Sequence, residues 1–369
     1  MVREGKLAWL EHDLTHRGLT AWALTAILIG FYIVLYYTEW LTPVARTLGL
    51  DGKWTLYGLL YTLAILAGGI HVIRKYRHNR YQVVRTSVVM FVQAVFGFSV
   101  PQILNFFHQP AYYFSYLWPL KFDDFVPGTI FHLPLPYILY SFLGSLLLAP
   151  LLGAFFGKRW YCSWVCGCGG LANTAGDPLR HLTSKSTAAW KFEKASIYTV
   201  LGVCVALTAL LFVTWGVGGR YPALAVFTTR FQTFYGFLVV AMLSGVIGAG
   251  LYPLGGTRIW CRNFCPMAAL LGLVQKFGRF RIAVKENMCI SCGLCSKYCE
   301  MGIDVRSYAQ ANASFTRASC VGCGLCAAVC PRGVLRLENA ARRDPQEAAL
   351  VQIAPGSAPG RLAARPGTV

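Results

Sequence analysis

The sequence predicts an α-helical polytopic membrane protein with six transmembrane helices, followed by a small, cysteine-rich α+β domain. Three observations lead to this fold class. Of the 369 residues, 56% are hydrophobic and only 13% are charged. Apolar runs of about 20 residues, the length that crosses a bilayer, recur along the first two thirds of the chain. The last third instead concentrates eight of the 14 cysteines between Cys289 and Cys330.

Six apolar runs are long enough to span a membrane. We predict spans at residues 19–37, 54–73, 87–104, 137–156, 195–217 and 234–254. The preceding segment, residues 1–18, contains acidic side chains and no small-residue cleavage site, so we expect it to be retained and not cleaved as a signal peptide. The spans and the loops between them form a predicted membrane domain over residues 19–283.

The distribution of lysine and arginine predicts which ends of the spans face the cytoplasm. The N-terminal segment and the second and fourth loops together carry 14 basic residues, whereas the first, third and fifth loops carry five. Because cytoplasmic loops are enriched in basic residues, both termini and the cysteine-rich domain are predicted to be cytoplasmic. A net charge of +19 could also indicate nucleic-acid binding, but the basic residues flank apolar spans and form no nucleic-acid-binding motif.

The cysteine-rich stretch contains one motif twice. Each copy has the spacing C-x2-C-x2-C-x3-C, in which three thiolates of one copy and the last thiolate of the other hold a [4Fe-4S] cluster. Gly293 and Gly324 occupy equivalent positions and permit tight turns. Structural zinc sites and a disulfide framework are the alternatives, although zinc motifs usually use two separated C-x2-C pairs. The expected ligand sets are Cys289, Cys292, Cys295 and Cys330 for one cluster, and Cys320, Cys323, Cys326 and Cys299 for the other.

Over residues 284–337 this stretch resembles a bacterial two-cluster ferredoxin. The resemblance implies a ferredoxin domain, which we place at residues 284–340. The remaining residues, 341–369, lack hydrophobic periodicity and are predicted to form a disordered tail. One departure is that Pro331 follows the second copy of the motif whereas Glu300 follows the first. The glutamate alters the polarity beside Cys299 and leaves the ligand assignment intact.

A second group of cysteines lies where the fourth and sixth spans end. The sequence GKRWYCSWVCG, from Gly157, aligns with GTRIWCRNFCP, from Gly256, which indicates a duplicated helical hairpin. Four thiolates would then meet at one membrane surface, and we predict a third [4Fe-4S] cluster there, whose negative charge Arg159 and Arg258 would offset. Ordinary buried cysteines or a zinc clip are the alternatives. The four predicted ligands are Cys162, Cys166, Cys261 and Cys265.

Two cysteines remain. Cys168 extends the first of these motifs to C-x3-C-x-C, so it is an alternative ligand of the third cluster. Cys204 lies inside the fifth span, where we expect it to be a small apolar packing residue.

The paired motifs and the ferredoxin stretch together resemble the NapH, NosR and CcoG group of membrane polyferredoxins over most of the chain. Cys261, Cys265 and Pro266 match the C-x3-C-P motif fully, whereas Gly167 replaces the proline after Cys166. The resemblance implies a protein of the bacterial cytoplasmic membrane, an electron-transfer subunit of an oxidoreductase complex. It would relay single electrons between the quinone pool, or a flavoprotein, and a cytoplasmic redox partner.

Two other functions stay open. CcoG-like relatives suggest an assembly factor that reduces a metal such as copper during maturation of a respiratory enzyme. The other possible function is that of a passive membrane tether for a larger complex.

Three histidines are further candidates. The aromatic outer segment 105–136 is expected to anchor at the membrane surface, although a quinone pocket there could use His108 or His132 as a proton partner. His71 lies within the second span and is a candidate proton carrier near a quinone. Haem ligation by His71 is the alternative, but no histidine partner is predicted at a matching depth.

Overall fold

The computed structural model describes residues 8–218 and 220–339. Within this range, six helical segments are long and apolar enough to cross a membrane, which confirms the predicted number. They are Leu19–Tyr37 (α2), Lys53–Lys75 (α4), Arg80–Phe106 (α5, η1 and α6), Leu135–Phe156 (α8, η3 and α9), Thr187–Gly216 (α12) and Pro222–Ala249 (α13 and η5). The sixth begins and ends earlier than predicted, because Pro222 starts the helix and the residues after Ala249 form a separate turn, α14 (Tyr252–Gly255).

Three of the spans widen into π-helical turns. These are η1 (Gln93–Ser99), η3 (Leu143–Leu148) and η5 (Gly236–Ala249), and they adjoin α5 (Arg80–Val92), α6 (Val100–Phe106), α8 (Leu135–Phe142), α9 (Ala149–Phe156) and α13 (Pro222–Tyr235). Such turns are rare and frequently mark functional sites. Residues of η1 and η5 line the main cavity of the membrane domain.

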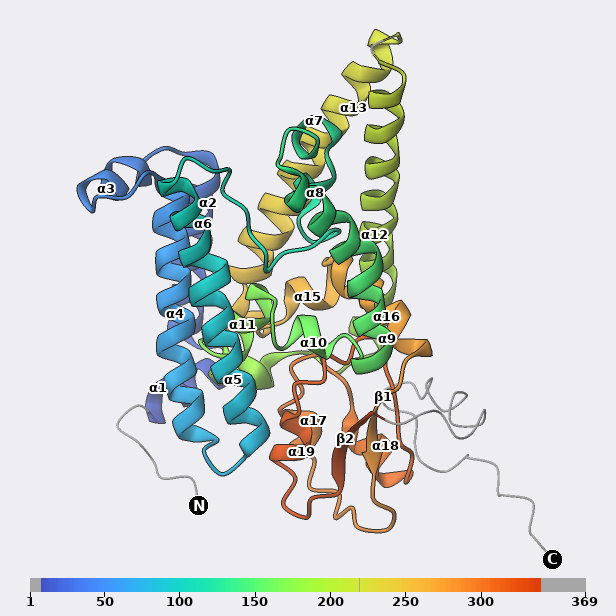
Figure 1. Ribbon diagram of the computed structural model, residues 1–369. Helices are drawn as coiled ribbons and strands as arrows, with labels where there is room; N and C mark the ends of the chain where they lie inside the picture. Colours follow the sequence, from blue (N-terminus) through green and yellow to red (C-terminus); the bar gives the residue numbers. More distant parts are fainter. Residues whose placement is uncertain (1–7, 219, 340–369) are drawn as a thin grey trace, which may run out of the picture.

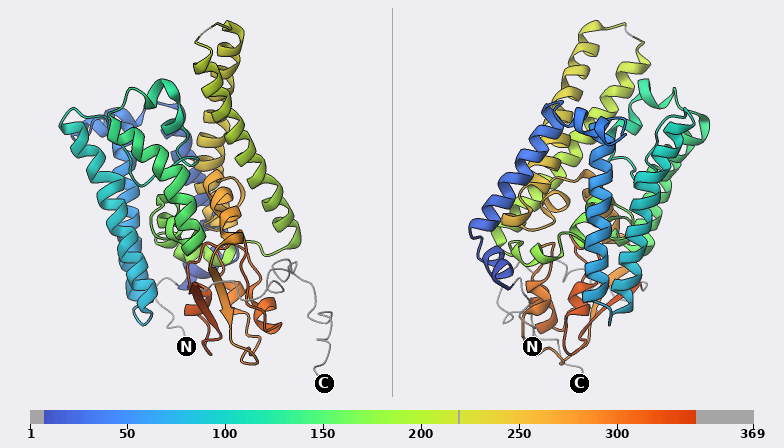
Figure 2. Two further views of the ribbon diagram at one scale, coloured as in Figure 1. Left: turned by 45° about the vertical axis from the view of Figure 1, so that its right-hand side comes forward. Right: turned by 90° about the vertical axis from the view of Figure 1, so that its left-hand side faces the viewer.

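The connecting segments alternate between the two ends of the bundle (Figure 1). One end carries α1 (Ala8–Thr15), the turn between α4 and α5, η4 (Asp177–Leu182) and the small C-terminal domain. The other end carries α3 (Leu41–Thr47), α7 (Pro127–Ile130) and the turn between α12 and α13. Figure 2 shows from two further sides that the small domain lies below one end of the bundle. This alternation is the one that six spans require.

The small domain is built on a two-stranded antiparallel sheet. Strand β1 (Phe280–Val284) begins directly after α16 (Pro266–Phe277) and pairs with β2 (Leu335–Asn339). The short helices α17 (Leu294–Lys297), α18 (Val305–Gln310) and α19 (Leu325–Ala328) complete the domain. Gly293 and Gly324 precede α17 and α19 with φ angles of +78° and +75°, so the two copies of the cysteine motif make the same left-handed turn.

The outer segment between α6 and α8 differs from the expectation of a surface anchor. It folds back into the bundle, where Leu117 and two residues of η2 (Phe122–Phe125), Phe122 and Phe125, are buried. Polar side chains of the spans give the segment its hydrogen bonds. The Trp118 indole donates to Thr208 Oγ1 (3.1 Å), and the Trp118 amide donates to Ser145 Oγ (3.1 Å). The predicted surface position is therefore wrong for the part around Leu117 and Trp118, where partners inside the membrane domain satisfy the backbone, whereas Phe106 and Phe107 at the start of the segment are exposed.

This insertion predicts a stability difference between two leucine substitutions. Leu117 is 4% exposed, whereas Leu135 is 65% exposed at the start of α8. Leu117→Ala should lower the free energy of unfolding by about 2–5 kcal/mol, because it leaves a cavity in a packed interior. Leu135→Ala should change it by less than about 1 kcal/mol. Thermal unfolding in detergent measures both, and equal midpoints for the two variants would contradict an inserted segment.

Candidate iron–sulfur sites

The two motif-bearing hairpins have the same backbone course. In one, α10 (Arg159–Cys162) is followed by α11 (Gly167–Asn173), and in the other, α15 (Ile259–Asn263) is followed by α16. The Cys166 amide donates to the Tyr161 carbonyl (2.8 Å), and the Cys265 amide donates to the Trp260 carbonyl (3.0 Å). Cys166 and Cys265 each cap the following helix, whose N-terminal dipole favours negative charge. The duplication inferred from the sequence thus extends to the backbone hydrogen bonds.

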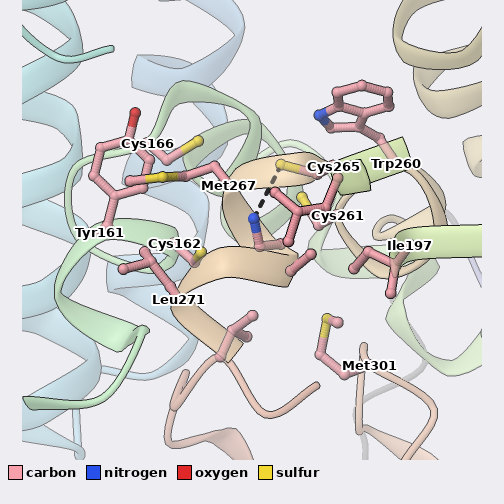
Figure 3. Close-up of a cluster of buried hydrophobic side chains, with 14 of the residues drawn as sticks. Tyr161, Cys162, Cys166, Ile197, Trp260, Cys261, Cys265, Met267, Leu271 and Met301 are labelled. Carbon is pink, nitrogen blue, oxygen red and sulfur yellow. Dashed lines mark hydrogen bonds between the residues drawn. The ribbon is translucent and has the colours of Figure 1, made fainter. Parts of the chain in front are cut away.

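The four cysteines of the hairpins lie together in the protein interior (Figure 3). Burial raises the pKa of the Cys265 thiol, and the neighbouring thiols of Cys261, Cys166 and Cys162 raise it further, so one thiol senses the other three. Burial likewise raises the pKa of Cys162 and Cys261 to about 11. Such thiols stay neutral until a metal or cluster displaces their protons. The set could hold a cubane cluster.

Basic groups are placed to offset a negative group at this position. Arg258 Nη1 lies 3.7 Å from Cys261 Sγ and donates to the Cys162 carbonyl at 3.3 Å. Its Nε is buried and has no hydrogen-bond partner among the described residues. The buried ammonium of Lys158 also counteracts the effect of burial on the pKa of Cys162. A cluster ligated by four thiolates fits these donors and charges.

Cys168, two residues after Cys166, lies at the wall of a cavity. The neighbouring Cys168 thiol, together with burial, raises the pKa of the Cys166 thiol, and Cys168 lines the cavity wall. A side chain at Gly167 would collide with the Tyr116 hydroxyl and would come within 2.9 Å of the Tyr61 hydroxyl. This close approach explains why glycine takes the place of proline after Cys166, and it brings two phenols beside the motif.

The cavity has a volume of about 400 Å³ and reaches both hairpins. Cys168 and Pro266, each within two residues of a motif cysteine, form part of its wall. Polar groups of Gln93, Lys121 and Asp123 also line it. This size and mixed lining suit a flat, mostly apolar ligand with polar ends. Aromatic residues are the largest group in the wall: Tyr32, Tyr36, Trp54, Tyr57, Tyr61, Tyr113, Tyr116, Phe122, Tyr235, Tyr252 and Trp260.

The small domain brings together two cysteine sets, each around its own cavity. One cavity is lined by Cys289, Cys292, Cys295 and Cys330, here called the distal set. The other is lined by Cys299, Cys320, Cys323 and Cys326, here called the proximal set. These are the sets predicted from the sequence. Among the described residues, no group of three or more Cys, His, Asp or Glu side chains is arranged to hold a single metal ion.

The proximal set is attached to the membrane domain through its backbone. Four successive carbonyls of its loop accept hydrogen bonds from membrane-domain side chains, and Arg85 adds a second bond to Cys323 O (2.8 Å). The four bonds are Gln275 to Cys320 O (3.0 Å), Ser163 to Val321 O (2.7 Å), Tyr81 to Gly322 O (2.9 Å) and Gln82 to Cys323 O (2.9 Å).

Arg159, predicted to flank the third cluster, lies instead over the Phe280 ring of β1, 4.9 Å from its centroid.

Glu300, the residue that departs from the ferredoxin pattern, is the centre of a buried ion-pair network. Its carboxylate accepts from Arg180 Nη1 (2.8 Å) and from Arg258 Nη2 (2.9 Å), and all three side chains are buried. Arg180 also pairs with Asp177 at 2.7 Å. Burial alone would raise the pKa of Glu300, but Arg258, Arg180 and Arg85 outweigh it and lower that pKa. Glu300 therefore joins Cys299 of the proximal set to the arginine beside Cys261.

Several basic residues that we counted as flanking the membrane spans lie instead at the interface between the membrane domain and the small domain. Arg85, Lys158 and Arg180 are buried, and each faces a cysteine site or the ion-pair network. Sequence spacing alone could not separate them from surface lysines and arginines. The predicted histidines lie elsewhere: His71, His108 and His132 are exposed, and none of them lines the aromatic cavity.

Comparisons with known proteins agree with this arrangement. A family model described as a 4Fe-4S dicluster domain matches residues 282–337, and one described as a 4Fe-4S binding domain matches residues 139–186 and 235–285. The second match covers both cysteine hairpins. No solved structure matches the chain.

Three curated relatives are similar to parts of the chain. YccM of Escherichia coli (strain K12) is 26% identical over 175 residues, 45% of this chain and 48% of the relative. The methylamine utilization ferredoxin-type protein MauN of Paracoccus denitrificans (strain Pd 1222) is 28% identical over 176 residues, 44% of this chain and 60% of the relative. Protein NirI of the same strain is 25% identical over 250 residues, 66% of this chain and 34% of the relative. The chain thus spans about half the length of the first relatives.

Six membrane spans joined to a domain with the 4Fe-4S dicluster pattern define a multi-pass membrane iron–sulfur protein of electron transport. Within that class, both family-model matches and the similarity to YccM, MauN and NirI support the resemblance to membrane polyferredoxins that the cysteine motifs indicate.

The Glu300 network predicts a strong effect of a small substitution. Glu300→Gln keeps the size of the side chain but removes the counter-charge of Arg258 and one of the two counter-charges of Arg180, so it should cost about 3–5 kcal/mol of stability. The matched control is Glu338→Gln, which removes a partly exposed pair with Arg281 and should cost at most about 1 kcal/mol. Chemical unfolding monitored by tryptophan fluorescence measures both, and equal losses would contradict the network.

The pH dependence has a defined sign. Since the pKa of Glu300 is lowered in the folded protein, its stabilisation is complete above the usual carboxyl pKa and disappears as the pH falls through the lowered value. Glu300→Gln should therefore flatten the acid limb of the stability profile.

Proposed function

We propose that this protein relays single electrons between a quinone or quinol in the aromatic cavity and a soluble redox partner on the cytoplasmic side. The observation that carries the proposal is the contact between the cavity and the four-cysteine site. Cys168 and Pro266 line the cavity, and the adjacent Cys166 and Cys265 belong to the buried sulfur group. A ligand there lies next to the group that could accept its electrons.

The residues favour one order of sites. Arg258 contacts Cys261 and Cys162 on one side and Glu300 on the other, and Glu300 follows Cys299 of the proximal set. We place the membrane-edge cluster first, the proximal cluster second and the distal cluster third. Each [4Fe-4S] cluster would supply reversible one-electron chemistry, while the protein fixes positions and charges.

The cavity offers groups for the protons of a quinol. Gln93, Lys121 and Asp123 line its wall, as do the phenols of Tyr61 and Tyr116. Lys121 and Asp123 come from the outer segment and Gln93 from a π-helical turn. These residues would orient the ring and exchange protons with it, whereas the apolar part of the wall excludes water. The end of the bundle that carries the small domain has the excess of basic residues, which favours a cytoplasmic location of that domain.

Iron analysis tests the third cluster. Anaerobically purified protein should contain about 12 iron and about 12 acid-labile sulfide per chain, as three [4Fe-4S] clusters require. The double substitution Cys162→Ser and Cys261→Ser should lower both values by about four. The control Cys168→Ser should leave them unchanged. Wild-type values of about eight would show that only the ferredoxin-type clusters are present.

Filling the cavity tests the quinone. Ser244 lies in the cavity wall, and Ser244→Trp should slow reduction of the clusters by a water-soluble quinol about tenfold or more. Reduction by dithionite should be unchanged. Leu238→Trp, a neighbouring substitution at a more exposed position of η5 outside the cavity wall, serves as the control. Normal quinol-dependent reduction of the Ser244 variant would remove the cavity from the proposal.

The position of Cys168 supports a second candidate function, the reduction of a metal ion. A half-buried thiol in the cavity, beside a cluster site, could instead bind a soft metal ion for reduction during enzyme maturation. In that case Cys168→Ser would abolish copper reduction with iron content intact, and Ser244→Trp would leave quinol-dependent reduction unaffected.

A further inference from the structure

We propose that the exposed surface around the distal cysteine set is the docking site for an acidic, soluble redox protein. This surface, here called the distal face, consists of residues 286–294, Arg306 and residues 331–333. The inference rests on one part of the proposed function, that electrons enter or leave at the distal set.

The sheet register puts the distal face at the far end of the molecule. Phe280, the first residue of β1, packs against Arg159 of the membrane domain. Val284, the last residue of β1, pairs with Leu335, the first residue of β2. Four steps of about 3.3 Å separate the two ends of β1, or about 13 Å. The distal face adjoins the Val284 end, opposite to the Phe280 end that contacts the membrane domain, and the small domain as a whole lies below the bundle in Figure 1.

Apolar side chains surround an exposed cluster ligand on this face. Ile290 is 52% exposed, and Met288 and Leu294 are each 36% exposed. Cys292 of the distal set is itself exposed, whereas the proximal set is covered by the membrane domain. A small apolar centre over a redox group, surrounded by charge, is what a short-lived electron-transfer contact needs.

The charge around this centre selects the partner. Arg306 and Arg332 line the distal set and form no ion pair with any residue that the structure describes. Lys285 and Arg336 lie next to the face, and Glu286 is the one acidic residue of the segment 285–294. Within the face, Arg306 and Arg332 outnumber Glu286 by one positive charge, and the flanking Lys285 and Arg336 raise this excess to three. An acidic partner complements such a rim, whereas a second copy of this chain would be repelled.

Hydrogen bonds hold the loop of the distal face in a strained shape. Asn287 and Ser291 have φ angles of +55° and +60°, which non-glycine residues rarely adopt. Gln310 Nε2 donates to Ser291 Oγ at 2.8 Å. Asn312 bonds to Asn287 twice, at 2.9 and 3.0 Å. A loop ordered in this way loses little entropy when a partner binds.

Stopped-flow electron transfer with two probes of opposite charge tests the docking site. Reduced flavodoxin, an acidic protein, donates to the full-length oxidised protein, and cytochrome c, a basic protein, accepts from the reduced protein. The double variant Arg306→Glu and Arg332→Glu should slow the flavodoxin reaction about tenfold at low salt and accelerate the cytochrome c reaction. The difference should vanish at about 1 M salt, where the Debye length is about 3 Å. The control Arg46→Glu and Arg220→Glu makes the same charge change at the opposite end of the bundle and should alter neither rate.

The outcomes separate this inference from the proposed function. Equal flavodoxin rates for wild type and the Arg306/Arg332 variant, at unchanged iron content, would overturn the docking site even if quinol reduces the clusters. Loss of quinol-dependent reduction with a charge-dependent flavodoxin reaction would overturn the quinone relay and leave the docking site standing. If the glutamate variant loses iron, Arg306→Gln and Arg332→Gln removes the charges without reversing them, and a smaller slowing in the same direction is then expected.

Discussion

The ion pairs of Glu300 are the interaction on which the arrangement of this protein depends. A carboxylate removed from water is unfavourable unless opposite charges compensate it, and here two arginines from two different cysteine-bearing segments do so. Removing Glu300 leaves the buried Arg258 without an acidic partner among the described residues, whereas Asp177 still pairs with Arg180. The small domain is thereby fixed against the membrane domain in one orientation, with the proximal cysteines inward and the distal cysteines outward.

Duplication explains how a bundle of spans builds a four-cysteine site. Each hairpin alone provides two thiols at the start of a helix, and two hairpins facing each other provide a complete set. The copies then differ where their surroundings differ. Pro266 begins α16 in the usual way, whereas Gly167 lies under the hydroxyls of Tyr61 and Tyr116, where a ring would not fit. Both halves of the duplicated site contact the cavity, through Pro266 in one and Cys168 in the other, but only the latter places a glycine beside two phenols.

The features that could be predicted from the sequence are those encoded by short-range patterns. Hydrophobic runs predicted six spans, and cysteine spacing predicted which thiols would meet in each set. Contacts between distant segments were not predictable in this way. The aromatic cavity draws on the outer segment and on several spans, and no local pattern of tyrosines indicates it. Glu300 was visible only as a departure from proline, and Arg85 and Arg180 were indistinguishable from residues that flank a membrane.

The connection between α16 and β1 has a consequence for the speed of the relay. Only Gly278 and Arg279 separate Phe277 from Phe280, and Phe280 is buried at the interface between the membrane domain and the small domain. Many electron carriers work by swinging a tethered head between a loading and an unloading position, and their turnover then depends on a search through solution. The two residues between α16 and β1 are too few to allow such a movement of the small domain. If electrons pass between the cysteine sites as proposed, the distances between these fixed sites, and not a movement of the small domain, would set the rate of transfer.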